Sequence, residues 1–374
     1  MYNKDFVEET WNKCERKLYA TAKRIGDSFP CRSDSNGNMV EFGSDLGIGS
    51  WTNGFWPGEM WIAYNNTKNE FYKKIAIKCE ERLDEAFDNF KDLNHDVGFM
   101  WIPTSVAHYM HDMNEKSRVR AMHAATILAG RFNHAAALIR AWDFDRPNWA
   151  IIDCMMNIPL LFWASENQKP YDPRFAQIAK MHADSVIEKF VREDGSVNHI
   201  VEFDMNNGDV LAIPPGQGYA SGSSWSRGQA WAIYGFVIAY NHTKDTKYLN
   251  IAKKVAHYFM INTDETGIPF SDFRAPKDEM LRDSSAGAVA ACGLIEIAKN
   301  VDRYEKEIYE NSAMKIIVGL EKNSDYSDDS DFILKHCCER YHGGEYGRNV
   351  SLVYGDYYFL EALSKIRGND VMFW

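Results

Sequence analysis

The chain has 374 residues, of which 45% are hydrophobic and 14% aromatic, so it can bury a large core. Its formal net charge is −11 and no cluster of lysine and arginine stands out, which argues against a nucleic-acid partner because phosphate backbones are bound through basic surfaces. No apolar stretch reaches the length of about 18 residues that a membrane-spanning helix requires.

The N-terminus and the cysteines bear on the cellular compartment. Residues 1–9 lack a basic start followed by an apolar run, so no signal peptide is expected. The seven cysteines are odd in number and scattered, apart from the adjacent Cys337 and Cys338, and this pattern does not predict a disulfide framework. We therefore expect a cytoplasmic protein with reduced thiols.

The hydrophobic pattern predicts helices from the first residues onward. Residues 5–25 place apolar side chains at helical spacing, and strand-like alternation of Val, Ile and Thr is scarce everywhere. A polar turn followed by an aromatic residue that opens the next helix occurs at 64–72 and returns at 241–248, and more loosely at 171–175. These features predict an all-α fold with internal repeats.

A second kind of segment, rich in Gly, Trp, Ser and Asp, alternates with these helices. The segments are 50–56, 94–99, 148–160, 223–231, 282–286 and 354–358. Six segments in 374 residues give about 62 residues each, enough for two helices and their loops. We therefore predict an α6/α6 barrel, a toroid of six α/α hairpins, formed by residues 1–374 as one catalytic domain. The inner helices would begin together at one mouth.

Two aspartates at these helix starts are the main candidates for chemistry. Asp153 stands inside an apolar run, and Asp96 belongs to a row of three polar residues, Asn94, His95 and Asp96, where a helix cap needs only one. The alternative is that such residues only cap helix N-termini, and for Asp283 and Asp356 we predict that structural role.

Burial decides the expected ionisation of Asp153. A helix N-terminus favours the anion by about 0.3–1 kcal/mol, whereas burial raises the pKa of an Asp by up to about 3–5 units. Desolvation can therefore keep a proton on Asp153, and a nearby Asp96 would act in the same direction. One protonated and one charged carboxyl group is the arrangement of an acid–base enzyme acting on glycosidic or related bonds.

The aromatic and polar residues near the predicted mouth suggest a sugar ligand. Indole faces with polar rims suit sugar rings, although Trp56 and Trp231 can equally belong to the core. The tryptophans at or near the predicted mouth are Trp51, Trp56, Trp142, Trp149, Trp225 and Trp231. The candidates for binding hydroxyl groups are His95, His199, Gln217 and Gln229. A zinc site is the competing interpretation for the histidines, but neither HExxH nor CxxC spacing is present.

Arg227 suggests that the sugar is acidic. It lies in the segment 223–231, and its guanidinium can bind a carboxylate in a bidentate manner. The alternative is an arginine paired with a structural aspartate. The first interpretation predicts a uronate as the ligand.

Six motifs, spread in order over most of the chain, resemble those of the unsaturated glucuronyl hydrolases of glycoside hydrolase family 88. They are Trp51-Thr52-x-Gly54-Phe55-Trp56, His95-Asp96-x-Gly98-Phe99, Ile152-Asp153-Cys154-x-x-Asn157, Gly222-Ser223-x-Trp225-x-Arg227-Gly228-Gln229-Ala230-Trp231, Arg282-Asp283-Ser284-Ser285-Ala286 and Gly355-Asp356-Tyr357-Tyr358. The resemblance implies an α6/α6 barrel that removes a 4,5-unsaturated uronic acid from the non-reducing end of lyase-generated oligosaccharides, without a metal or organic cofactor. The chemistry it implies is hydration of a vinyl ether.

The resemblance also implies roles for individual residues. Asp153 would give a proton to C4 and activate the water that adds at C5, and Asp96 would be the second essential carboxylate, holding ring hydroxyls. The pocket-lining positions are Trp51, His95, Trp142, His199, Gln217, Trp225, Arg227 and Trp231. Some family members have His immediately before the glutamine, where this chain has Gly216.

Several alternatives remain open from the sequence. Arg348 and Ser351 either meet a sulfate at the rim of the mouth or lie in a solvated loop. The chain can also be an unsaturated rhamnogalacturonyl hydrolase acting on pectin fragments, a sugar epimerase that uses histidines as acid and base, or a non-catalytic sugar-binding protein. The parent polysaccharide, protein partners and oligomeric state are not encoded in a readable way.

Overall fold

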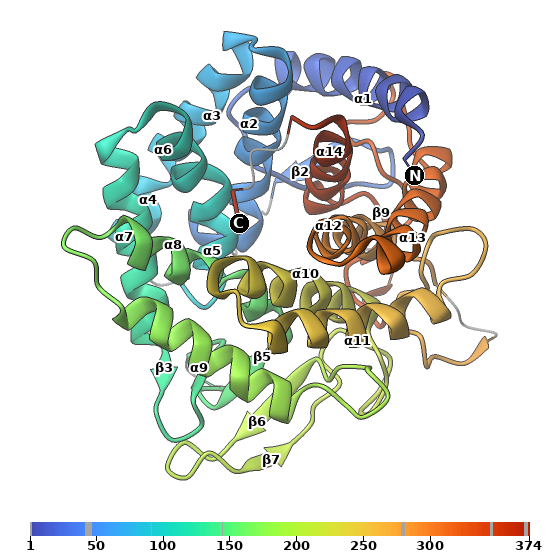
Figure 1. Ribbon diagram of the computed structural model, residues 1–374. Coiled ribbons are helices and arrows are strands. Elements are labelled where there is room, and N and C mark those ends of the chain that lie inside the picture. Colours follow the sequence, from blue (N-terminus) through green and yellow to red (C-terminus); the bar gives the residue numbers. More distant parts are fainter. Residues whose placement is uncertain are drawn as a thin grey trace.

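Helices dominate the structure and form two concentric rings (Figure 1). The structure is a computed structural model that describes residues 2–41, 47–90, 92–143, 145–277, 281–344, 347–369 and 373–374. The inner ring contains α2 (Phe55–Thr67), α5 (Val97–Trp101) continued by the π-helical η3 (Ile102–Val106) and α6 (Ala107–Asp112), the 3-10 turn η4 (Ile152–Met156) with α8 (Pro159–Asn167), α10 (Ser226–Thr243), α12 (Ser284–Asn300) and α14 (Val353–Arg367). The ring closes because α14 packs against both α12 and α2.

The outer ring covers the inner one, and each outer helix packs on an inner neighbour. Its members are α1 (Lys4–Ile25), α3 (Glu70–Arg82) with α4 (Asp84–Asn89), α7 (Glu115–Gly130), α9 (Arg174–Lys189), α11 (Thr246–Asn262) and α13 (Arg303–Lys322). The predicted α6/α6 barrel is confirmed.

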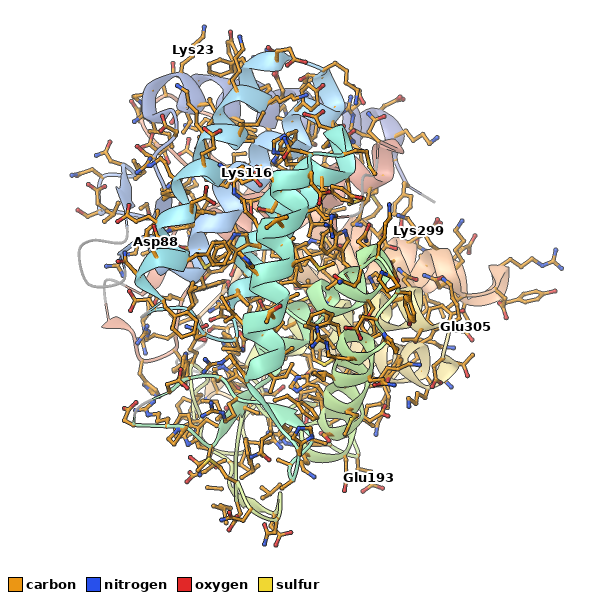
Figure 2. All side chains as sticks on the ribbon, turned by 90° about the vertical axis from the view of Figure 1, so that its left-hand side faces the viewer. Lys23, Asp88, Lys116, Glu193, Lys299 and Glu305 are labelled. Atoms are coloured by element: carbon orange, nitrogen blue, oxygen red, sulfur yellow. The ribbon has the colours of Figure 1, made fainter. Side chains whose placement is uncertain are left out.

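The two rings differ in how much of each helix is buried. Every residue of α12 from Ser284 to Ala298 is buried, whereas α1 buries only one face. Charged side chains of both signs project from the outer surface, including the exposed Lys23, Lys116 and Glu193 (Figure 2). The helices therefore follow the expected amphipathic rule only in the outer ring.

The predicted polar turns have the same construction at two places in the barrel. Lys68 and Lys244 end α2 and α10 in the left-handed conformation, and the next helices are capped by the side chains of Asn69 and Asp245. Such caps satisfy the unpaired N–H groups of the first turn. The repeated sequence phrase therefore corresponds to a repeated inner-to-outer turn.

Short antiparallel strands lie in the connections that lead to the inner helices, where we predicted none. They are β1 (Pro30–Ser33), β2 (Met39–Glu41), β3 (Phe132–Asn133), β4 (Leu138–Ile139), β5 (Trp149–Ile151), β6 (Ile200–Phe203), β7 (Val210–Ala212), β8 (Cys337–Cys338) and β9 (Arg348–Val350). Pairing of Ile151 with Ile200 continues in a hydrogen bond from the Ile152 N–H to the His199 carbonyl, 3.0 Å. This register places Asp153 beside His199.

The C-terminus ends inside the barrel. Trp374 is buried, stacks on Tyr358 with 5.9 Å between ring centroids and donates from its indole N–H to Glu361. All seven cysteines are buried free thiols. Among the helices that the structure describes, none combines the length and the apolar character needed to cross a membrane.

Candidate active site

Asp96 and Asp153 both lie where inner-ring helices begin, and neither carboxyl group caps its helix. Asp96 precedes α5 without accepting a capping hydrogen bond, and Asp153 lies in the first turn of η4. Each side chain keeps 15% of its surface exposed. The capping alternative is therefore wrong for both aspartates, and their carboxyl groups remain available to a ligand.

Asn157 connects the two aspartates, a role we did not predict although the residue belongs to the Ile152–Asn157 motif. Its side-chain oxygen accepts from the Phe99 N–H at 2.8 Å, which points its NH2 group toward the acids. That group donates to Asp96 Oδ1 at 3.4 Å and to the Asp153 carbonyl at 3.2 Å. A Cβ at Gly98 would lie 2.5 Å from the Asn157 Cα, so glycine is required for this approach.

Two histidines face the two carboxyl groups. Nε2 of His95 lies 3.4 Å from Asp96 Oδ1, and Nε2 of His199 lies 3.4 Å from Asp153 Oδ1. Nδ1 of His199 accepts a hydrogen bond from the Gln217 N–H at 2.9 Å. Because Nδ1 is an acceptor, the proton of the neutral ring resides on Nε2 and points toward Asp153.

The ionisation of the pair is the reverse of our expectation. Burial raises the pKa of Asp96 well above its ordinary value, and the charge of Asp153 raises it further. Burial also acts to raise the pKa of Asp153, but the adjacent His199, with His95 and Arg227, holds that pKa below its ordinary value. Burial lowers the pKa of His95 to about 3, so this imidazole is neutral. These opposite shifts favour the protonated form of Asp96 and the charged form of Asp153.

The guanidinium group of Arg227 is held by hydrogen bonds to other parts of the protein. Its Nη1 donates to Asp283 Oδ2 at 2.9 Å and to the Cys338 carbonyl at 2.6 Å, and its Nη2 donates to the Glu339 carbonyl at 2.6 Å. Only 1% of the residue is exposed. The structure thus shows the pairing with a structural aspartate, while three of the five N–H groups of the guanidinium are used by these bonds.

The predicted tryptophans divide into two groups. Trp51 is half-buried beside Tyr354 at a centroid distance of 4.9 Å, and Trp142 is half-buried with its ring edge-on to His95. Trp225 lies against His199 at 4.2 Å, and no hydrogen-bond partner of its indole N–H is found among the residues described. Trp231 is fully buried against Phe99 and Tyr358, and Trp56 is buried as well, so the core alternative holds for these two.

The two glutamines also differ. Gln217 is half-buried, fixes His199 through its backbone and donates from its side chain to the Glu339 carbonyl at 2.8 Å. Gln229 is fully buried and bonds to backbone groups of Gly195 and Val197, so it does not reach the mouth.

Gly216 explains the departure from the family pattern before Gln217. Its φ is +60°, and a Cβ there would lie 2.0 Å from His199 Nδ1. A larger residue in this backbone conformation would displace the histidine that faces Asp153.

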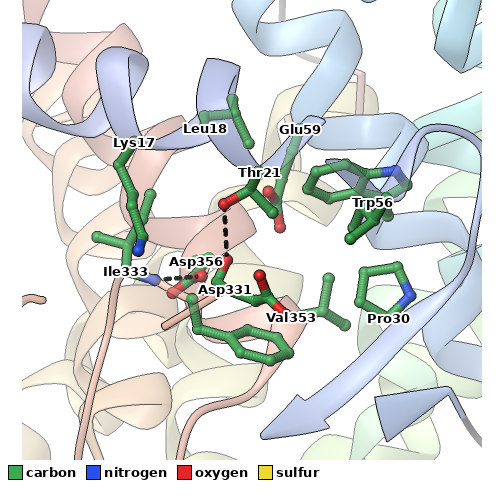
Figure 3. Close-up of a pocket in the computed structure, with 12 residues that line it drawn as sticks. Lys17, Leu18, Thr21, Pro30, Trp56, Glu59, Asp331, Ile333, Val353 and Asp356 are labelled. Atoms are coloured by element: carbon green, nitrogen blue, oxygen red, sulfur yellow. Dashed lines mark hydrogen bonds between the residues drawn. The ribbon is translucent and has the colours of Figure 1, made fainter. Parts of the chain in front are cut away.

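The two aspartates with predicted structural roles differ in outcome. Asp283 caps α12 by accepting from the Ser285 and Ala286 N–H groups, as expected. The capping role of Asp356 is wrong, because one of its oxygens accepts instead from the Ile333 N–H at 2.7 Å (Figure 3). Its other oxygen accepts from the Leu334 N–H, also at 2.7 Å. Burial raises its pKa to about 7.

The rim residues Arg348 and Ser351 are held by protein contacts. Arg348 begins β9 and donates from Nε to the Tyr341 carbonyl at 2.5 Å. Ser351 is buried, and its N–H donates to Ser33 Oγ at 3.0 Å. The solvated-loop alternative is therefore wrong for Ser351, and contact of Arg348 with a sulfate stays a prediction. Among the described parts of the chain, no group of three or more His, Cys or carboxylate side chains is arranged to hold a metal ion.

Comparison with known proteins places this geometry in a family. The chain is 34% identical to the unsaturated glucuronyl hydrolase of Bacillus sp. (strain GL1) over 365 residues, which cover 94% of each chain. It is 32% identical to the unsaturated chondroitin disaccharide hydrolase of Streptococcus pneumoniae over 334 residues, covering 87% of this chain and 83% of the relative.

Solved structures give the same result. The crystal structure of unsaturated glucuronyl hydrolase from Bacillus sp. GL1 superposes with a TM-score of 0.91 at 32% identity, covering 97% of both chains. The Streptococcus agalactiae enzyme of the same name has a TM-score of 0.92 at 30% identity, covering 100% of this chain and 95% of the other. The model of Glycosyl Hydrolase Family 88 matches residues 21–368. With the predicted motifs and the carboxyl pair on the same barrel, the chain belongs to glycoside hydrolase family 88.

Proposed function

We propose that the protein removes the 4,5-unsaturated uronic acid from the non-reducing end of lyase-generated oligosaccharides of the glycosaminoglycan type. The observation that carries this proposal is the carboxyl pair at the barrel mouth, Asp96 and Asp153, each with an imidazole Nε2 at 3.4 Å. The relatives named for unsaturated glucuronyl and chondroitin disaccharide substrates support the substrate class. We also propose that the barrel is one catalytic domain in the cytoplasm.

In the proposed mechanism Asp153 is the general acid and base. Protonation of C4 leaves positive charge at C5 and the ring oxygen, and the resulting Asp153 carboxylate takes a proton from the water that adds at C5. The hemiketal then opens and releases the next sugar. Asp96, held by Asn157 and His95, binds ring hydroxyl groups. A protonated Asp96 can donate to a hydroxyl oxygen as well as accept.

Before it can act as the acid, Asp153 must take up a proton from water when the substrate binds, because its pKa is held low in the free protein. His199 directs its Nε2–H toward the Asp153 oxygen. The uronate carboxylate and the loss of water raise the pKa of Asp153 when the substrate binds, since both disfavour a second negative charge. The charge of Arg227 acts on Asp153, and because this arginine is buried and paired with Asp283, we propose that it attracts the uronate carboxylate through its charge and not by direct contact.

The decisive experiment follows the ultraviolet absorbance of the C4=C5 double bond. Incubation with an unsaturated chondroitin disaccharide should abolish this absorbance and release the second sugar as a free monosaccharide. Turnover of an unsaturated rhamnogalacturonan disaccharide, without turnover of the chondroitin disaccharide, would show that the substrate is a pectin fragment. Binding without any loss of absorbance on either disaccharide would leave a sugar-binding protein and overturn the enzymatic proposal.

A further inference from the structure

Trp374 belongs to none of the six sequence motifs, yet only two residues link it to both carboxyl groups of the site. It is 4% exposed and lies inside the inner ring (Figure 1). Its indole meets the ring of Phe99 edge-on, with 6.1 Å between centroids and an interplanar angle of 77°. Phe99 is the third residue of α5, the helix that begins after Asp96. Trp374 therefore packs against the helix start that carries Asp96.

The indole of Trp374 is held in one orientation by α14. Its N–H donates to Glu361 Oε2 at 3.2 Å, and its ring stacks on Tyr358 at an interplanar angle of 21°. Tyr357 meets the same ring edge-on at a centroid distance of 6.2 Å. The buried Glu361 also accepts from the hydroxyl of Tyr234 on α10. Two inner helices thus fix the indole, and in a close-packed core a fixed ring restrains its neighbours.

Phe99 is the residue through which this packing reaches the site. It is 1% exposed, and four aromatic rings surround it with centroids between 5.1 and 6.1 Å away. When one of these rings is lost, Phe99 and its backbone can shift into the space that is left. The four rings are Trp51, Phe55, Trp231 and Trp374.

The backbone of Phe99 connects the packing to the two carboxyl groups. Its N–H donates to Asn157 Oδ1 at 2.8 Å and so sets the orientation of the Asn157 amide. The NH2 group of that amide donates to Asp96 Oδ1 at 3.4 Å and to the Asp153 carbonyl at 3.2 Å. The bond to Asp96 is already long for an N–H···O bond, so a small displacement of Phe99 is enough to break it.

We propose that Trp374 is a positioning residue for the carboxyl pair. It acts through Phe99, whose N–H orients the Asn157 amide on Asp96, and it touches no substrate itself. The inference rests on the proposed function, because an effect on turnover requires that the carboxyl pair catalyses a reaction. A tryptophan that only filled the core would stabilise the fold and leave the orientation of Asn157 unchanged.

A double-mutant cycle with Asn157 separates positioning from core filling. Trp374→Ala should lower kcat for an unsaturated chondroitin disaccharide about tenfold, with KM within about threefold of the wild type, because the carboxyl groups are displaced from their productive geometry. Asn157→Ala should also lower kcat, and adding Trp374→Ala to it should cause no further loss, since the link is already cut. Trp374→Phe keeps a ring against Phe99 and should recover most of the lost kcat. If Trp374→Ala does not fold, Trp374→Leu takes its place in the cycle.

The matched control is Trp11, which is 2% exposed on the outer helix α1. Trp11→Ala removes a buried side chain of the same size and should leave kcat within about twofold of the wild type at a temperature where the variant is folded. An unchanged kcat in Trp374→Ala, a full additive loss in the double variant, or an equal loss in Trp11→Ala would each overturn the inference.

Hydrogen exchange provides a readout that does not depend on the substrate. The Phe99 amide should exchange about tenfold faster in Trp374→Ala than in the wild type, beyond any change at the amides of α11, whereas Trp11→Ala should leave it unaltered. An unchanged exchange rate of the Phe99 amide in Trp374→Ala would overturn the inference. Absence of turnover by the wild-type protein would instead refute the proposed function, and the exchange rates would still decide whether Trp374 positions Asn157.

Discussion

Two of the groups of buried carboxyl groups in the barrel, one at the mouth and one beneath α1, differ in their exposure and in their partners. Asp96 and Asp153 lie at the mouth with 15% of each side chain exposed. Glu59 and Asp356 line a cavity of about 10 Å³ beneath α1, where they are 2% and 4% exposed (Figure 3). That volume holds about one water molecule. Burial raises the pKa of Asp96, Glu59 and Asp356 alike.

The partners of the carboxyl groups separate the two regions. Asp356 uses both oxygens on backbone N–H groups, which fixes the segment that leads to Cys338 and Glu339. The pKa of Asp153 is held below its ordinary value by His199, whose Nε2 lies 3.4 Å from Asp153 Oδ1. Glu59 has a buried oxygen, Oε1, without a hydrogen-bond partner among the residues described. Burial of a carboxyl group therefore does not by itself mark a reaction site, and the mouth pair is set apart by its imidazole neighbours and its partly exposed side chains.

Replacement of Asp153 is expected to have the largest effect on activity. Asp153→Asn keeps the shape of the side chain but can neither donate the proton to C4 nor accept one from water, so kcat should fall about 10³-fold or more. Binding of the unsaturated disaccharide, measured by titration calorimetry, should stay within about threefold of the wild type.

The control for Asp153 is an exposed aspartate away from the mouth pair. Asp209 begins no helix and is exposed beside β7, so Asp209→Asn should keep full activity. Substantial turnover by Asp153→Asn would exclude Asp153 as the acid and base, whatever its pKa.

Asp356 provides the corresponding test of the structural group. Its pKa is about 7 in the folded protein, above the unfolded value of about 4, so the folded state binds the proton first. This contribution to stability is complete below about pH 4 and is lost as the pH rises to about 7, a difference of about 4 kcal/mol. The unfolding free energy of Asp356→Asn should therefore depend less on pH in this range, as measured by urea denaturation.

Asp96 acts on stability in the same direction, so Asp96→Asn is the matched variant that separates the two contributions. Asp356→Asn will also lower stability at every pH, because its amide nitrogen faces a backbone N–H that has lost its acceptor. That offset does not change the slope. An unaltered slope in Asp356→Asn would show that Asp356 stays charged throughout this range.

The fold was predictable because its signals are local and repeated. Six polar, Gly- and Trp-rich segments opened the inner helices, and Asn69 and Asp245 marked equivalent turns. The short strands were not predictable, since two- to four-residue strands are decided by which loops meet across the mouth. The same holds for the π-helical turn at 102–106, which has no sequence signature.

The sequence singled out residues that meet at the mouth, but it did not predict their contacts. Asp96 and Asp153 stood out because helix capping did not require them, and the structure leaves both free of that role. The predicted ionisation of Asp153 was wrong because the β5–β6 pairing, a tertiary contact, brings His199 beside its carboxyl group. The prediction that Gln229 lies at the barrel mouth was wrong. Helical spacing does not show which residues of a fully buried helix face the mouth and which face the core.

Gly216 allows the smallest and most specific test of the mouth, where His199 is held against Asp153. Gly216→Ala adds one methyl group where a Cβ would lie 2.0 Å from His199 Nδ1, and its φ of +60° disfavours alanine. We expect kcat/KM for the unsaturated disaccharide to fall about ten- to a hundredfold as His199 is displaced from Asp153.

Gly222, with a φ of +77° and open space around its Cβ, provides the matched control. Gly222→Ala has similar backbone strain and should keep nearly full activity, because its methyl group meets nothing. Equal losses in the two variants would assign the effect to strain in the loop and remove the orientation of His199 from the mechanism.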